Sequence, residues 1–149
     1  MPGVDDLRGQ PAVVDASVAI RWLVPEAASR EAIAAYFQTT AWRAPRLLLS
    51  EVASGLRRKA AEGDISKDEA LAGLAAVLDA VEDGVLKLSF DEAVVGSALL
   101  IALASGHKLH DCMYLALAER EGAHLVTADV KLANVARSRG VPTVLLPSA

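Results

Sequence analysis

The sequence is poor in residues on which several common protein classes depend. Its single cysteine, Cys112, cannot form an internal disulfide, which agrees with a reducing compartment. Aromatic residues make up only 4% of the chain, so the core must be built from Ala, Val, Leu and Ile. The longest uncharged apolar run, residues 93–104, is about half of the roughly 20 residues that span a bilayer. The N-terminal residues lack the basic and apolar segments of a signal peptide. We therefore expect a cytoplasmic protein without a membrane partner.

The chain also lacks a net positive charge and a nucleotide-binding motif. The formal net charge of −4 argues against general adhesion to nucleic acid. It does not exclude a nuclease, because carboxylates gathered in one cleft would dominate the sum and bound Mg²⁺ would reverse the local sign. No glycine-rich phosphate loop occurs, so nucleotide hydrolysis lacks its usual parts. His107 and His110 stand near Asp111, but no other spacing completes a tetrahedral zinc set.

The chain contains what one globular domain requires. With 149 residues, 53% of them hydrophobic, it is long enough to bury a single core. No repeat, low-complexity tract or linker divides it. We expect one domain over residues 1–149, with a frayed leader over residues 1–10. Cys112 is interpreted as a small buried hydrophobe.

Short apolar strands alternate with helices along the sequence. Strands are expected at 12–15, 85–88, 124–127 and 143–146, and helices at 17–22, 26–38, 45–62, 66–84, 92–105, 109–121 and 131–139. Ser66 and Glu69 form a capping box. Ser17 is expected to N-cap the first helix, Pro45 to begin the third, and Asp91 to cap the fifth. The alternation predicts an α/β fold of three layers, with a parallel sheet of four to five strands between helices.

Four acidic residues interrupt apolar stretches instead of lying in solvated charge runs: Asp15, Glu51, Asp111 and Asp129. Asp15 and Asp129 lie at or just past the ends of expected strands, where open α/β sheets bind ligands. Asp111 and Glu51 fall on inward faces of expected helices, with Gly55 leaving space near the Glu51 carboxylate. A buried carboxylate is costly unless it is paired, hydrogen-bonded or bound to a metal. If the four converge, they form a site for a hard divalent cation.

Each of these residues also has a simpler interpretation. Aspartate is a preferred N-cap, so each of the three aspartates could only cap the helix that follows it. Glu51 could form a salt bridge. Ser17 and Thr127 lie two residues from Asp15 and Asp129, where their hydroxyls would support a ligand set. At this level both interpretations stay open.

Four segments resemble the PIN domains, and in particular the VapC toxins of bacterial toxin–antitoxin pairs. They are Val-Val-Asp15-Ala-Ser17-Val, Ser-Glu51-Val-Ala after Pro45, His-Asp111-Cys-Met-Tyr-Leu-Ala-Leu-Ala, and Leu-Val-Thr127-Ala-Asp129. The last two are the most specific, and the resemblance covers nearly the whole chain.

The resemblance implies a PIN-like α/β/α domain that binds Mg²⁺ or Mn²⁺ and cleaves RNA as an endoribonuclease. The metal-binding and catalytic residues that it implies are Asp15, Glu51, Asp111 and Asp129. Glu51 would bind metal or orient the attacking water, and Ser17 and Thr127 would support the ligand set. A homodimer and a VapB-like antitoxin partner are implied as well.

The densest basic group is Arg57-Arg58-Lys59. Arg58 follows Glu51 by seven residues on the same helix face, so it is a candidate for contact with a substrate phosphate. The alternative is a solvated helix end that compensates the helix dipole.

Three other functions stay open beside the toxin nuclease. One is a PIN-type RNA-processing nuclease outside a toxin pair. Another is a scaffold that binds RNA or a partner without cleavage. The third is a phosphoacceptor or aspartyl-phosphate phosphatase, since Asp15 ends the first strand. That third function lacks a second acid two residues later and a lysine after a strand.

Overall fold

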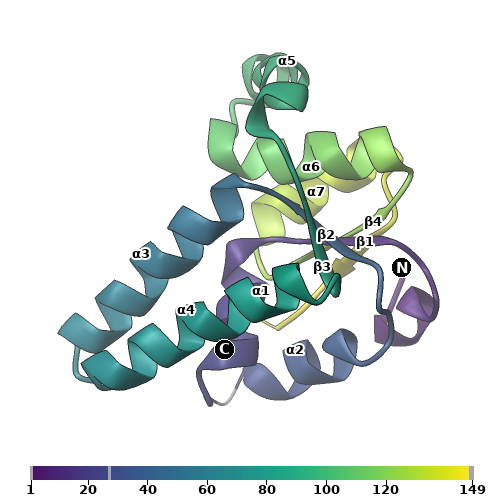
Figure 1. Ribbon diagram of the computed structural model, residues 1–149. Coiled ribbons are helices and arrows are strands. Elements are labelled where there is room, and N and C mark those ends of the chain that lie inside the picture. Colours follow the sequence, from purple (N-terminus) through teal and green to yellow (C-terminus); the bar gives the residue numbers. More distant parts are fainter. Residues whose placement is uncertain (1, 27, 148–149) are drawn as a thin grey trace.

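A parallel sheet with helices on both faces forms the centre of the computed structural model, which describes residues 2–26 and 28–147 (Figure 1). The strands in these ranges are β1 (Ala12–Val14), β2 (Trp42–Pro45), β3 (Leu86–Ser89), β4 (His124–Thr127) and β5 (Thr143–Leu145). The α-helices are α1 (Ala16–Leu23), α2 (Ser29–Tyr36), α3 (Leu47–Ala61), α4 (Lys67–Glu82), α5 (Val95–Ser105), α6 (Leu109–Glu121) and α7 (Val130–Ser138). Two short 3₁₀ helices are η1 (Val4–Leu7) and η2 (Asp91–Ala93). The predicted three-layer α/β/α fold with a parallel sheet is confirmed.

The strand order is β3-β2-β1-β4-β5, and all neighbouring strands are parallel. From the central strand β1, the chain adds β2 and then β3 on one side of the sheet. It then crosses to the other side of β1, where it adds β4 and then β5. Figure 1 shows α1 and α2 on one side of the sheet and α6 and α7 on the other. Open α/β sheets bind ligands at the carboxyl ends of the strands where the order reverses, which here lies between β1 and β4.

The core is built from small aliphatic side chains, as the composition predicts. Every residue of β1 is buried. In α6, all residues from 112 to 118 are buried, because this helix packs against both the sheet and α5. Cys112 is among them as a buried hydrophobe. Trp22 packs edge-on against Tyr36 and Trp42, with ring centroids 5.0 and 4.8 Å away.

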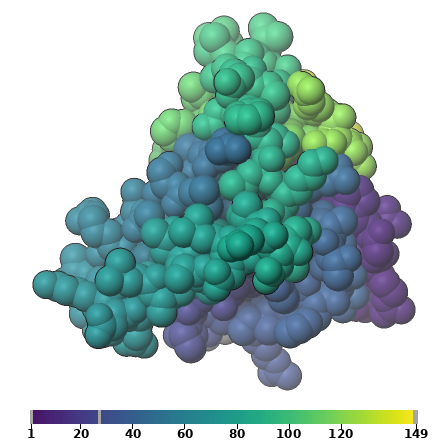
Figure 2. All heavy atoms as spheres, in the orientation of Figure 1, coloured from purple at the N-terminus to yellow at the C-terminus, as the bar shows by residue number. Residues whose placement is uncertain are grey.

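Helices α3 and α4 lie side by side and extend beyond the sheet, while α5 forms the top of the molecule in this view (Figure 2). The predicted capping box at the start of α4 is present. Ser66 Oγ accepts a hydrogen bond from the Glu69 backbone N–H, and Glu69 Oε1 accepts one from the Ser66 backbone N–H, both at 3.0 Å. Local sequence therefore determines where this hairpin turns back.

Strand β2 corrects the expectation that Pro45 begins a helix. Pro45 is the last residue of β2, and α3 begins at Leu47. The strand Trp-Arg-Ala-Pro is only four residues long and has no clear apolar alternation. It is held by pairing with β1 on one side and β3 on the other. Proline is tolerated because it lies at the end of the strand.

Two helix caps also differ from the expectation. Asp15, not Ser17, is the N-cap of α1, and its carboxylate accepts a hydrogen bond from the Val18 backbone N–H. Asp91 does not cap α5, which begins after the separate helix η2. The Oδ1 atom of Asp91 instead accepts a 3.0 Å hydrogen bond from the backbone N–H of Leu47, at the start of α3. This cap joins residues 44 positions apart, which local patterns do not reveal.

Residues 2–10 differ from the frayed leader that the sequence suggested. Leu7, at the end of η1, is completely buried in the core. The Gly9 backbone N–H donates to Gln38 O at 3.1 Å. The Thr39 hydroxyl donates to Gln10 O at 2.6 Å, and Val4 packs against the core beside Leu7, so several contacts attach the segment to the domain. The expected leader, the helix at 26–38 and the expected domain also include residues outside the described ranges, namely Met1, Ala27, Ser148 and Ala149.

Candidate metal centre

The four acidic residues from the sequence line one cavity of about 480 Å³. Asp15 directly follows β1 and Asp129 follows β4 after one residue, so the strand order brings both to the same crevice. Glu51 reaches the cavity from α3 and Asp111 from the first turn of α6. Other side chains that line it are Ser17, Arg58, His110 and Tyr114. Residues far apart in the chain thus share one acidic site.

Asp15 is the most buried member, with 5% of its surface exposed. Its Oδ1 accepts hydrogen bonds from Ser17 Oγ at 2.6 Å and from the Val18 backbone N–H at 3.1 Å. Its Oδ2 accepts one from the Thr127 hydroxyl. Burial raises the pKa of the Asp15 carboxyl to about 6, although these hydrogen bonds act in the opposite direction. Asp15 is therefore a helix cap and a member of the acidic site at once.

Thr127 connects Asp15 with Asp129. Besides donating to Asp15, its Oγ1 accepts a 3.0 Å hydrogen bond from the backbone N–H of Asp129. Asp129 Oδ1 caps α7 by accepting from the Leu132 backbone N–H at 3.1 Å. The other carboxylate oxygen of Asp129 faces His107. Ser17 and Thr127 both donate to the Asp15 carboxylate, and Thr127 also accepts from the Asp129 backbone.

His107 lies between two of the carboxylates, although the sequence analysis placed it only near Asp111 and did not assign it to the acidic site. Its Nε2 is 3.0 Å from Asp111 Oδ2 and 3.5 Å from Asp129 Oδ2. One ligand atom from each of these three residues lies within 4.8 Å of the other two. The available signal was the spacing of four residues between His107, just before α6, and Asp111, in its first turn.

Glu51 is held by Tyr114, a second residue that sequence reasoning did not assign to the site. The Tyr114 hydroxyl donates to Glu51 Oε1 at 2.5 Å, and the tyrosine side chain is almost completely buried. Burial and the nearby Glu51 raise the Tyr114 pKa far above its usual range, so the hydroxyl keeps its proton. The other oxygen of Glu51 lies 3.9 Å from His110 Nδ1. The spacing of Tyr114 three residues after Asp111 was the only local signal.

Gly55 allows α3 to approach α1 closely. A Cβ atom at this position would lie 2.2 Å from Ile20 Cδ1, so no other residue fits without movement. The sequence suggested that Gly55 leaves space near the Glu51 carboxylate. Ile20 instead takes much of the space beside Gly55. The glycine therefore lets α3, which carries Glu51, pack closely against α1, which Asp15 caps.

The three basic residues at the end of α3 differ in position. Arg58 lines the acidic cavity. Arg57 is exposed and is not among the lining residues that the structure describes. Lys59 Nζ forms a 3.0 Å ion pair with Glu26 Oε2. Of these three residues, Arg58 is the one that the structure places at the acidic cavity.

The donor atoms in the cavity fit a divalent cation. Carboxylate oxygens are the preferred ligands of Mg²⁺, and Mn²⁺ accepts both oxygen and imidazole nitrogen. His107, Asp111 and Asp129 already group their ligand atoms. No lysine lines the cavity in the part of the chain that the structure describes, so the phosphoacceptor function gains no support.

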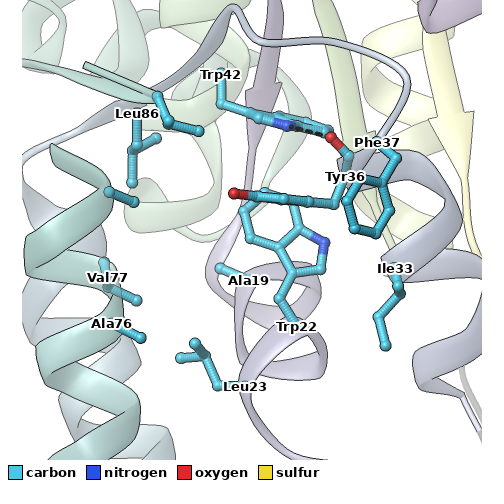
Figure 3. A pocket seen from close by; sticks show the side chains of 12 residues that line it. Ala19, Trp22, Leu23, Ile33, Tyr36, Phe37, Trp42, Ala76, Val77 and Leu86 are labelled. Atoms are coloured by element: carbon cyan, nitrogen blue, oxygen red, sulfur yellow. Dashed lines mark hydrogen bonds between the residues drawn. The ribbon is translucent and has the colours of Figure 1, made fainter. Parts of the chain in front are cut away.

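A second hollow, of about 320 Å³, lies between α1, α2 and α4 (Figure 3). Its walls are apolar and include Trp22, Ile33 and Phe37. Tyr36 is its one titratable lining residue within residues 2–26 and 28–147. Apart from this phenol, the described lining offers no acid, base or metal ligand, so we assign the candidate chemistry to the acidic cavity.

The fold and the cavity define an α/β protein with an acidic cavity at the carboxyl ends of its central strands. Residues 12–138 match the PIN domain family. The chain is 35% identical over 121 residues to Ribonuclease VapC3 from Pyrobaculum aerophilum. The aligned region covers 81% of this chain and 91% of the relative. The chain belongs to the PIN domain family.

Two solved structures share the fold. A crystal structure from Pyrobaculum aerophilum has a TM-score of 0.67 and 23% identity, covering 91% of this chain and 92% of the other. A domain of a functionally unknown protein from Methanocaldococcus jannaschii has a TM-score of 0.53 and 18% identity, covering 95% and 94%. Across residues 2–26 and 28–147, no helix has the length and apolar character needed to cross a membrane.

Proposed function

We propose that this PIN domain is a divalent-metal-dependent endoribonuclease that hydrolyses RNA phosphodiester bonds as the toxin of a toxin–antitoxin pair. The observation that carries the proposal is the gathering of four carboxylates in one open cavity. Family membership supports it, as does the relative that is named a ribonuclease. Because the cavity is acidic, a phosphate backbone enters it favourably only together with a cation.

Asp15, Asp111 and Asp129 are the residues that would hold Mg²⁺ or Mn²⁺. When bound, the cation supplies a Lewis acid that stabilises charge on the phosphodiester and makes water a stronger nucleophile. The protein supplies orientation. Ser17 and Thr127 fix the oxygens of Asp15, and the backbone of α7 fixes one oxygen of Asp129.

Glu51 is suited to orient the attacking water and accept its proton. Tyr114 anchors one of its oxygens, while the other oxygen stays available in the cavity. A carboxylate held in this way loses little freedom when it bonds to water. Arg58, on the same helix, offers a guanidinium to the phosphate.

The decisive experiment is RNA cleavage with Mg²⁺, with Mn²⁺ and with EDTA, using wild-type protein and the variants Asp15→Asn and Asp111→Asn. We expect activity only with metal and a loss of roughly 100-fold or more in both variants. Asp79→Asn is the matched control, because Asp79 is exposed on α4 and outside the cavity. Cleavage that survives EDTA, or full activity in either site variant, would contradict the proposal.

The proposed partners are RNA, a VapB-like antitoxin and a second copy of the chain, all in the cytoplasm. The homodimer is supported by α5, where Leu99, Leu100 and Leu103 are exposed while Ala98 and Ile101 face the core. Figure 2 shows this helix at the edge of the molecule. Monomers rarely leave such an apolar helix face uncovered.

A PIN nuclease that processes RNA outside a toxin pair would use the same cavity. The two functions differ in their effect on cells, because an unpaired toxin arrests growth and a bound antitoxin restores it. Expression with and without the product of a neighbouring small gene distinguishes them. A scaffold that only binds RNA would bind equally well in the Asp111→Asn variant and would not cleave with any metal.

A further inference from the structure

His107 occupies a distinctive position in the acidic cavity. Its side chain is only 11% exposed, and its Nε2 is aimed at two carboxylate oxygens, Asp111 Oδ2 at 3.0 Å and Asp129 Oδ2 at 3.5 Å. The three ligand atoms lie within 4.8 Å of one another. Neighbouring ligands around an octahedral ion with bonds of 2.0–2.1 Å are about 3 Å apart. The spacing of these side chains therefore suits a shared cation.

The backbone explains why the imidazole points inward. Gly106 ends α5 in the left-handed conformation, with φ of 73°, and the chain then reverses into α6. The His107 backbone N–H donates to Ser105 Oγ at 3.2 Å, which holds the start of the turn. His107 lies just before α6 and Asp111 lies in its first turn, so both side chains are at the same end of the helix. The ring is thus positioned by the α5–α6 connection.

Resting on the proposed function, we propose that His107 Nε2 is a metal ligand together with Asp111 and Asp129, and that it shifts the preference of the site from Mg²⁺ toward Mn²⁺. Mg²⁺ favours oxygen ligands and keeps its water, whereas Mn²⁺, although carboxylates suit it too, is a first-row transition ion that accepts an imidazole nitrogen more readily than Mg²⁺ does. An all-carboxylate site would not discriminate in this way. His107 is therefore the residue that sets which cation activates the enzyme.

A competing role is that His107 only pairs with the carboxylates in the metal-free protein and moves aside when a cation enters. The two roles differ in the atoms around bound Mn²⁺. A ligand imidazole gives nitrogen hyperfine coupling in pulsed electron paramagnetic resonance, and a displaced one does not. His110 is the matched control, because its side chain is 64% exposed and it stands beside Glu51 instead of Asp111 and Asp129.

The experiment measures Mn²⁺ and Mg²⁺ binding, and the nitrogen coupling of bound Mn²⁺, in wild type, His107→Gln and His110→Gln. We expect coupling in wild type and His110→Gln and its loss in His107→Gln. Mn²⁺ affinity should fall at least about tenfold in His107→Gln, with a much smaller change for Mg²⁺. Thermal unfolding of each variant confirms that it is folded.

Two results would overturn the inference: bound Mn²⁺ without nitrogen coupling in wild type, or coupling that persists in His107→Gln. If wild type shows no coupling but cleaves RNA in a metal-dependent way, the inference fails and the proposed nuclease function stands. If neither cation binds and cleavage ignores EDTA, both fail. These outcomes separate the identity of the ligand from the function of the site.

Discussion

The hydroxyl of Thr127, at the end of β4, donates a hydrogen bond to Asp15 Oδ2, at the end of β1. The two residues are 112 positions apart in the chain, and the pairing of two parallel strands brings them together. The same hydroxyl accepts from the Asp129 backbone N–H. One buried side chain therefore orients two of the acidic residues, and its removal should weaken metal binding at the proposed site.

Thr127→Val keeps the shape of the side chain and removes the hydroxyl. We expect metal affinity or activity to fall by roughly 10- to 100-fold, because the partners that orient ligands matter nearly as much as the ligands. Thr143→Val is the control, since Thr143, the first residue of β5, is also buried but donates to Val141 O outside the cavity. Both variants should lose similar stability, about 1–3 kcal/mol. Equal metal affinity in the two variants would argue against the role of Thr127.

Tyr114→Phe removes the hydrogen bond to Glu51 without opening a large cavity. If Glu51 orients water, cleavage should fall by roughly 10- to 100-fold while metal affinity changes little, because the three aspartates are untouched. Tyr36→Phe removes the same atom from the apolar hollow and should leave cleavage unchanged. Rates at saturating metal and RNA provide the comparison. A fall in metal affinity in Tyr114→Phe would instead assign Glu51 to metal binding.

The buried Asp15 should make stability depend on pH in metal-free protein. Its pKa rises from 3.8 to about 6 on folding, so between these values the folded state holds a proton that the unfolded chain has lost. Its contribution to stability is therefore full below about pH 4 and is lost as pH rises through 6. The expected loss is about 3 kcal/mol.

Urea unfolding in EDTA from pH 4 to 7.5 measures this loss. The decline should be smaller in Asp15→Asn, which carries no charge at this position, and unchanged in Asp79→Asn. Saturating Mn²⁺ at pH 7.5 should stabilise wild type, because a ligand that binds only the folded state shifts the equilibrium toward it. Identical pH profiles for wild type and Asp15→Asn would exclude Asp15 as the source.

Gly55→Ala should destabilise the protein by up to about 2 kcal/mol, because the added Cβ would meet Ile20 Cδ1 at 2.2 Å and displace that side chain, which outweighs the roughly 1 kcal/mol that alanine gains over glycine in a helix. Ile20→Val removes that Cδ1 atom and should restore part of the loss in the double variant, as residues in contact are not additive. Gly96→Ala is the control, since nothing lies within 4 Å of its added Cβ. In α5 it should be neutral or stabilising by up to about 1 kcal/mol. If the changes in unfolding free energy of Gly55→Ala and Ile20→Val simply add in the double variant, the proposed clash is refuted.

The apolar face of α5 should hold two copies of the chain together. Leu100→Glu and Leu103→Glu place a charge on residues that are 70% and 74% exposed, so the folded monomer should tolerate them while the dimer should not. Leu71→Glu, at a 69% exposed position on α4, is the control. Sedimentation velocity should report monomers for the two α5 variants and dimers for the control and wild type. If the wild-type protein is monomeric at all concentrations tested, the proposed α5 dimer is wrong.

Sequence patterns were most informative where short-range chemistry decides the structure. The capping box of Ser66 and Glu69 depends on residues three apart, and it is present as predicted. Strand β4 coincides with its prediction, because its apolar run lies between clear turn signals. Strand β2 was missed because its four residues take their conformation from pairing with two neighbours. The cap from Asp91 to Leu47 was missed for the same reason.

The sequence by itself determined the α/β alternation, the positions of most helices and which four acidic residues stand in apolar surroundings. Only the tertiary structure decided that they share one cavity, that His107 lies between Asp111 and Asp129, and that Tyr114 anchors Glu51. The reason is physical. Propensity, capping and periodicity act over a few residues, whereas strand order and helix packing bring together side chains whose separation in the chain carries no signal.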